Sequence, residues 1–172
     1  MQIYLTNLGM YNEGTLHGMW LKLPITDEEI QTALDKIGIG ARYEEYFITD
    51  YENDLGLKVG EYESLSELNE VATCVESLNP HEKQVLKAVI EMDLSNVSDI
   101  VDIIGNLDTY TLNANIKSYH DLGRYLIHES GEFDKYTVET LEPYLDYETY
   151  GYTHSSNVEG KLSSYGWLER CY

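Results

Sequence analysis

The sequence predicts an α+β protein built from short helices and strands. Ile3–Leu8 is typical of a strand. Capping boxes at Thr26–Glu29 and Ser64–Glu67 each precede an apolar repeat with helical spacing. We therefore expect three small domains in a row, with no Pro- or Ser-rich linker between them. They are an N-terminal α+β domain at residues 1–61, a central helical domain at 62–105 and a C-terminal α+β domain at 106–172.

The N-terminal domain is expected to hold one helix packed on an antiparallel sheet. The first strand leads through a turn at Gly9–Gly14 into a second strand at Thr15–Leu23. The helix opened by Thr26 carries an apolar face and ends at Gly38. A third strand is predicted at Tyr43–Ile48.

Three helices are predicted in the central domain. The first follows the Ser64 cap, and the second starts with Asn79 as cap and Pro80 at its first position. The third is capped by Ser95 or Asn96 and ends at Gly105.

The C-terminal domain is expected to start with a strand and to end with a hairpin. The strand is Leu107–Leu112, and Ser118 caps a helix that stops near Gly131. Lys161–Cys171 is predicted to form a strand pair that turns near Ser164–Gly166.

Between these elements, tyrosines recur at spacing three, at Tyr144, Tyr147 and Tyr150. The pattern predicts one amphipathic helix with Thr140 as N-cap, Pro143 inside the first turn and Gly151 as the stop. Two interpretations stay open at this point. The tyrosines are half-buried core residues of an ordinary helix, or they form a self-association or partner surface, because tyrosine is enriched at interfaces.

The charge balance is strongly acidic. The chain has 31 acids and 11 bases, a net charge of −20, and 16 tyrosines beside two tryptophans and two phenylalanines. The net charge is −7, −7 and −6 over residues 1–61, 62–105 and 106–172. A tail or a single metal cage would concentrate the charge, whereas this charge is spread along the sequence.

No motif indicates catalysis, a metal or a cofactor. The five histidines and two cysteines lack metal-ligand spacing, and neither a P-loop nor a nucleophile elbow is present. Asp50–Glu61 imitates the spacing of an EF-hand loop, but Leu55 stands where that loop needs glycine. We expect no enzyme activity, no cofactor and no bound metal.

The sequence also bears on location and partners. Met1–Leu8 is too short and too polar for a signal-peptide core, and no apolar run could span a membrane, so cytoplasm with reduced thiols is expected. Direct nucleic-acid binding is excluded by sign, because phosphate contacts need clustered Lys and Arg. The opposite hypothesis remains, since twenty charges match the phosphates on about 34 Å of duplex. Such a chain could occupy the DNA groove of another protein.

Four segments of the chain resemble the ArdA antirestriction proteins of conjugative plasmids and transposons. They are Tyr4–Gly14, Tyr43–Glu52, Ser66–Asn69 and Leu141–Gly151, and the last is similar to the family's antirestriction motif. The resemblance extends over nearly the whole chain.

The resemblance implies an elongated three-domain homodimer that imitates bent B-form DNA. It would occupy the DNA-binding groove of Type I restriction-modification enzymes, at the methyltransferase core. The dimer would form through the C-terminal domain, with the antirestriction motif at or near the interface: Leu141, Glu142, Tyr144, Leu145, Asp146, Tyr147, Glu148, Tyr150 and Gly151. The DNA-mimic surface would consist of acids elsewhere, for which the candidates are Asp27, Glu28, Glu29, Glu44, Glu45, Asp50, Glu52, Asp54, Glu61, Glu63, Glu67, Glu70 and Glu76.

Two other functions remain open. One is an acidic interaction module for a different basic protein, such as a nucleoid protein or a transcription regulator. The other is an enzyme of unrecognised type, which a measured turnover or a tightly bound metal would favour.

Overall fold

The computed structural model describes residues 1–92 and 96–171. Ser95, one of the two candidate caps, lies outside the described residues. The chain divides into two compact units. Unit 1 consists of Met1–Asn79 with Ser95–Gly105, and unit 2 consists of Pro80–Leu94 with Asn106–Tyr172.

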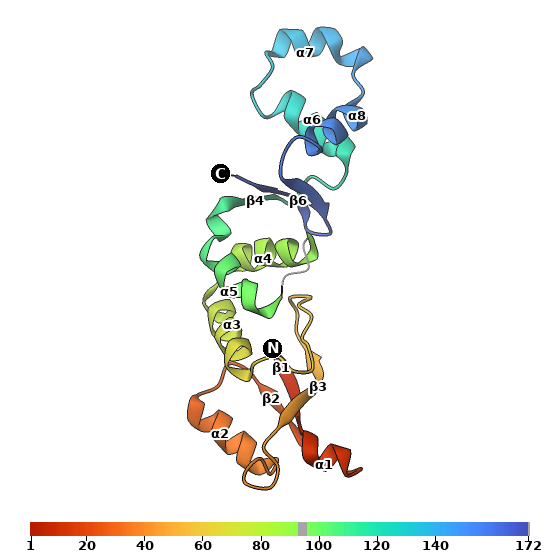
Figure 1. The fold of residues 1–172 in the computed structure, drawn as a ribbon. Helices are drawn as coiled ribbons and strands as arrows, with labels where there is room; N and C mark the ends of the chain where they lie inside the picture. The colour runs from red at the N-terminus through yellow and green to blue at the C-terminus, as the bar shows by residue number, and fades with distance from the viewer. Residues whose placement is uncertain (93–95, 172) are drawn as a thin grey trace. The chain divides into compact units, whose positions relative to one another are not determined.

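Unit 1 is built on a three-stranded antiparallel sheet. Strand β1 (Gln2–Asn7) lies between β2 (Gly18–Lys22) and β3 (Tyr46–Glu52) (Figure 1). Ile3 and Leu5 point to the inner face and are fully buried, and the alternate residues of β1 point to the other face. The predicted antiparallel sheet is therefore present.

Helix α2 (Asp27–Lys36) packs at the inner face, where the buried Asn7 side chain donates a 3.0 Å hydrogen bond to the Ile37 carbonyl just beyond the helix. The predicted capping box is confirmed. Thr26 accepts from the Glu29 backbone, and the Glu29 carboxylate accepts from Thr26 N–H at 2.8 Å.

Three details of the N-terminal prediction are wrong. The predicted turn is a short helix, α1 (Leu8–Asn12), because Asn7 acts as its N-cap and accepts from Met10 N–H at 2.9 Å. The second strand starts at Gly18 rather than Thr15. The third starts at Tyr46, three residues later than predicted, and continues to Glu52.

The predicted central helices are present, but they pack in two different places. Helices α3 (Leu65–Ser77) and α5 (Val97–Gly105) pack against each other in unit 1. Helix α4 (Pro80–Met92) instead packs on the sheet of unit 2, with Val85, Leu86 and Val89 buried. A central helical domain at 62–105 therefore stays a prediction, as does the three-domain division.

The sheet of unit 2 has strand order β4 (Tyr110–Asn113), β6 (Gly166–Arg170), β5 (Gly160–Ser163), with both pairings antiparallel. The predicted C-terminal hairpin is confirmed. The predicted strand at Leu107–Leu112 is partly wrong, because its first three residues form a 3-10 turn, η1 (Leu107–Thr109).

The predicted tyrosine helix is wrong as a single helix. Helix α6 (Tyr119–His128) has the expected Ser118 cap, but α7 (Lys135–Leu141), the turn η2 (Glu142–Tyr144) and α8 (Tyr147–Ser155) follow as separate elements. Pro143 cannot donate the backbone bond that would continue α7. The chain turns extended at Leu145, and Asp146 then starts a new helix as its N-cap. Thr140 therefore lies inside a helix rather than at a start.

Candidate functional site

The thirteen candidate acids of the DNA-mimic surface all lie in unit 1, and twelve are exposed, with Glu63 partly buried. Among the described residues, ion pairs join Glu13 to Arg42, Lys135 to Glu139 and Glu159 to Arg170. None of these uses a candidate acid. Apart from Asp54, which has a further interaction, the candidates carry carboxylates with no basic partner in the described part of the chain.

Two candidates lie on the outer face of the unit 1 sheet. In the strand register, Asp50 is opposite Tyr4 and Glu52 is opposite Gln2. The Gln2 side-chain amide donates to the Glu52 carboxylate. Two residues along a strand span about 6.8 Å, a length over which one DNA strand carries about two charges along the helix axis.

Three further candidates, Asp27, Glu28 and Glu29, occupy the first turn of α2. Acids at this position also stabilise the helix, because they face the positive end of its dipole. This helix packs at the inner face of the sheet, so its acids are not neighbours of Asp50 and Glu52.

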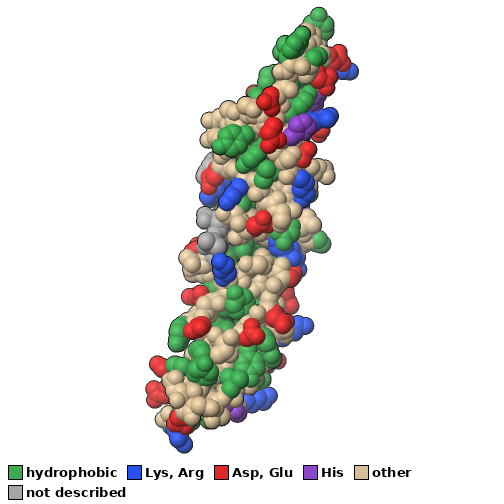
Figure 2. Space-filling model, turned by 90° about the vertical axis from the view of Figure 1, so that its right-hand side faces the viewer, with side chains coloured by type: hydrophobic (Ala, Val, Ile, Leu, Met, Phe, Trp, Pro, Cys, Tyr) green, Lys and Arg blue, Asp and Glu red, His purple; other side chains and the backbone are tan. Residues whose placement is uncertain are grey.

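The acids on α3 divide in the same way. Glu67 and Glu70 are three residues apart and share one face of the helix. Glu76 is nine residues from Glu67, which places it about half a turn away at 100° per residue. The candidates therefore surround unit 1 and do not gather in one patch. Figure 2 shows red carboxylate side chains at many places on the face it presents, interspersed with green and tan surface.

The negative charge is less evenly divided between the two structural units than it is along the sequence. Unit 1 holds 17 acids and 4 bases, whereas unit 2 holds 14 acids and 7 bases. The net charges are −13 and −7. The difference arises because residues 62–79 and 95–105, which carry six acids and no base, belong to unit 1, whereas residues 80–94 have a net charge of only −1.

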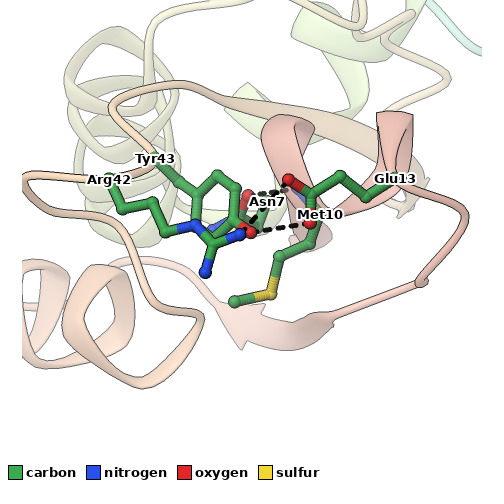
Figure 3. A network of polar contacts seen from close by, with 5 residues as sticks. All are labelled: Asn7, Met10, Glu13, Arg42 and Tyr43. Atoms are coloured by element: carbon green, nitrogen blue, oxygen red, sulfur yellow. Dashed lines mark hydrogen bonds and ion pairs between the residues drawn. The ribbon is translucent and has the colours of Figure 1, made fainter.

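A polar network joins the N-terminal segment that resembles the family to Arg42 and Tyr43 (Figure 3). The Glu13 carboxylate accepts from Tyr43 O–H at 2.8 Å and lies 3.5 Å from the Arg42 guanidinium. The bond to Glu13, with desolvation, raises the pKa of Tyr43 although Arg42 opposes it. A Cβ at Gly9 would lie 2.2 Å from the Tyr43 ring, so only glycine fits there. This network holds α1 to the segment before β3.

Several residues of Leu141–Gly151, the segment that resembles the family's antirestriction motif, hold unit 2 together. The Asp146 carboxylate accepts from the backbone and the hydroxyl of Thr149, at 3.0 and 2.8 Å, and these bonds lower its pKa. Tyr150 packs against the cluster of Ile116, Leu122, Leu126 and Trp167. Burial, and then the charge of Glu132, raise the pKa of Tyr150.

Gly151 is not a helix stop but the contact point of two helices. It lies buried in the middle of α8, and a Cβ there would be 2.0 Å from the Tyr119 carbonyl oxygen of α6. Reciprocally, a Cβ at Gly123 of α6 would be 2.0 Å from the Tyr147 carbonyl oxygen. Two glycines thus let the backbones of α6 and α8 touch.

Tyr147 is held by a stripe of three α6 residues at spacing four. The His128 ring nitrogen lies 2.7 Å from the Tyr147 hydroxyl, Arg124 stands 5.9 Å from the ring centre and the His120 ring is 5.4 Å away. Neither this stripe nor the role of Gly123 was found from the sequence. The i, i+4, i+8 spacing of His120, Arg124 and His128 was the available signal.

Of the remaining motif residues, Leu145 is partly buried and the others, Leu141, Glu142, Tyr144 and Glu148, are exposed. Tyr144 is 84% exposed and Leu141 is 46% exposed. An apolar pocket of about 210 Å³ is lined by Leu141, Leu145 and Tyr150 together with Phe133 and Val138. The motif therefore has an inner part that stabilises unit 2 and an outer part that faces solvent.

Within residues 1–92 and 96–171, no group of three or more His, Cys, Asp or Glu side chains could hold a metal ion. In the loop with EF-hand spacing, Asp50 and Glu52 belong to β3, and Asn53 accepts from the backbone N–H groups of Leu55 and Leu57. None of the described helices is both long and apolar enough to cross a lipid bilayer.

Comparison with known proteins adds one finding. A comparison with curated proteins gave no match. The family model described as antirestriction protein (ArdA) matches residues 3–169, nearly the whole chain. The match covers both units, the N-terminal network and the broken motif. The chain therefore belongs to the ArdA family of antirestriction proteins.

Proposed function

We propose that this protein inhibits Type I restriction-modification enzymes by occupying the DNA-binding groove of their methyltransferase core as an acidic mimic of B-form DNA. The observation that carries this proposal is the surface of unit 1, with 17 acids against 4 bases. A groove that binds a phosphate backbone presents clustered Lys and Arg. The candidate acids other than Asp54 are carboxylates with no basic partner in the described part of the chain, and such carboxylates complement this groove.

The mimicry is distributed over unit 1. The candidate acids lie on the sheet, on α2 and on α3, and an exposed charge pair contributes at most about 1 kcal/mol. Affinity then comes from many weak contacts and falls steeply with salt, as DNA binding does. No acid in this arrangement acts as a catalyst, and the protein works by excluding DNA.

We further propose that the protein acts as a homodimer formed by the C-terminal region. Leu141 and Tyr144 offer exposed apolar surface next to the pocket lined by Leu145 and Tyr150. Unit 2 is the less acidic unit, so its self-association meets less repulsion.

The test is DNA cleavage and DNA methylation by a purified Type I enzyme, with and without the protein, at two salt concentrations. We expect inhibition of both reactions, relief by added DNA, and weaker inhibition at higher salt. Binding to a nucleoid protein or transcription regulator without any effect on the Type I enzyme would contradict the proposal and favour a general acidic interaction module.

A further inference from the structure

Aromatic rings are exposed to solvent on the outer face of the unit 1 sheet. Nothing in the packing of the unit requires this exposure. Tyr4 of β1 and Trp20 of β2 are directly opposite each other, with ring centres 5.4 Å apart in an edge-to-face arrangement. Trp20 is 41% exposed. A tryptophan in this state exposes a large apolar surface to water, which is costly in a small unit.

A second aromatic group lies on the same face. Phe47 of β3 is opposite Thr6, which shares the outer face with Tyr4. The rings of Tyr11 and Tyr62 lie 5.1 and 6.4 Å from that of Phe47. Phe47 is buried by this contact, but Tyr11 is 49% exposed and Tyr62 is 73% exposed. The two groups are neighbours because Tyr4 and Thr6 are alternate residues of one strand.

Carboxylates border these rings. Asp50 is opposite Tyr4, Glu52 is two residues further along β3, and Glu61 precedes Tyr62 while its carbonyl accepts from Ile48 N–H of β3. Lys22, at the end of β2, is a base on the same face. Aromatic side chains at the centre with charged side chains at the edge is the usual composition of a protein interface.

The charge of this border decides what covers the face. A second copy of the chain would place the same carboxylates against one another, because unit 1 carries a net charge of −13. A basic surface matches both parts, since Arg side chains pair with carboxylates and also stack on aromatic rings.

We propose that the aromatic sheet face, defined as Tyr4, Tyr11, Trp20, Phe47 and Tyr62, docks against the basic DNA-binding groove of the target restriction enzyme. Trp20 and Tyr62 act there as local anchors within the distributed charge contacts. The inference rests on the proposed function and makes it more specific, because a purely electrostatic mimic has no use for exposed rings.

The experiment measures inhibition of DNA methylation by a purified Type I methyltransferase, with the full-length protein and the variants Trp20→Ala, Tyr62→Ala and Tyr136→Ala. Tyr136, in α7 of unit 2, is 80% exposed and serves as the matched control. Tyr62 contacts the fold mainly through one stacked ring, so its variant is expected to fold. Circular dichroism and thermal melting check that each variant is folded.

We expect Trp20→Ala and Tyr62→Ala to raise the half-inhibitory concentration at least about tenfold, as loss of an interface anchor does. Tyr136→Ala should stay within about twofold of the wild type. If the wild type inhibits and both sheet variants inhibit equally well, the aromatic face is not the contact and the proposed function survives. If the wild type neither binds nor inhibits the enzyme, both proposals fail. If the sheet variants lose only self-association, seen by sedimentation, the face binds a second copy and the inference is overturned.

Discussion

Unit 1 and unit 2 differ in where they place their charge and their aromatic residues. Unit 1 has the larger negative charge and an open sheet face bearing Trp20 and Tyr62. Unit 2 packs Tyr147 and Tyr150 beside the contact of Gly123 with α8, while Tyr136, Tyr144 and Tyr152 stay exposed outside its sheet. Several residues of Leu141–Gly151 thus stabilise the fold of unit 2, and the surface that we propose for a basic partner lies in unit 1.

The largest effect is expected at the helix contact of unit 2. Gly151→Ala places a Cβ 2.0 Å from the Tyr119 carbonyl oxygen, and backbone atoms cannot yield as a flexible side chain does. We expect the free energy of unfolding to fall by about 3 kcal/mol, measured by urea denaturation. Gly105→Ala, at the end of α5 in unit 1, meets no atom within 4 Å and should change stability by less than about 1 kcal/mol. Equal stability of both variants would mean that the two helices can separate without cost.

The second prediction tests the charge difference between the units. Seven acids of unit 1 are changed to amides, and a matched variant changes seven exposed acids of unit 2. At up to about 1 kcal/mol per exposed pair, the unit 1 variant should lose about a hundredfold in affinity for a Type I methyltransferase, measured by titration, and the unit 2 variant clearly less. Equal losses would show that total charge matters and not its location. The unit 1 set is Asp27, Glu28, Glu29, Glu44, Glu45, Asp50 and Glu52; the unit 2 set is Asp108, Glu129, Glu132, Glu139, Glu142, Glu148 and Glu159.

The third prediction separates self-association from target binding. Tyr144→Asp adds a charge at a side chain that is 84% exposed in the motif, so the fold should survive while the dimer weakens about tenfold or more. Tyr62→Asp makes the same change in unit 1 and should leave the dimer intact. Sedimentation at micromolar concentration measures both. A monomeric wild type, or a Tyr144→Asp protein that remains fully dimeric, would contradict the proposed dimer interface in the C-terminal region.

The fourth prediction concerns the stability of the protein at acidic pH. Bonds from Thr149 lower the pKa of Asp146 in the folded protein, so its stabilising effect is present above the unfolded pKa, about 3.9, and is lost as pH falls through the lower folded value. Asp146→Ala should lower the melting temperature near neutral pH by a few degrees, and the difference from wild type should shrink towards strongly acidic pH. The control is Glu148→Ala. Glu148 lies two residues after Asp146, in the first turn of α8, and its side chain makes no such bonds. A difference that stays constant down to low pH would contradict the capping role.

The smallest effect is expected for one carboxylate. Glu44→Gln in unit 1 should weaken binding to the methyltransferase by less than about 1 kcal/mol, since its contact is one exposed pair among many. Titration at low salt, where such contacts are strongest, measures this. Complete loss of binding with an intact fold would identify Glu44 as an essential contact and contradict distributed mimicry.

The sequence by itself determined the local structure. Thr26, Ser64 and Ser118 cap helices as predicted, because a cap involves only residues three positions apart. The hairpin near Ser164 and the acidic balance follow from the sequence as well. The resemblance of four segments identified the family that the family model then confirmed.

Tertiary structure decided what depends on distant residues. Gly151 ends a helix by local rules but lies buried in α8, because α6 approaches it there. Helix α4 looks like its neighbours in sequence but packs on the sheet of unit 2, whereas α3 and α5, which carry acids and no base, belong to unit 1. The exposure of Trp20 and the position of Asp50 beside Tyr4 depend on strand register across β1, β2 and β3. Periodicity tells which residues share a face of one element, but only the packing of the elements decides which face is left open to solvent.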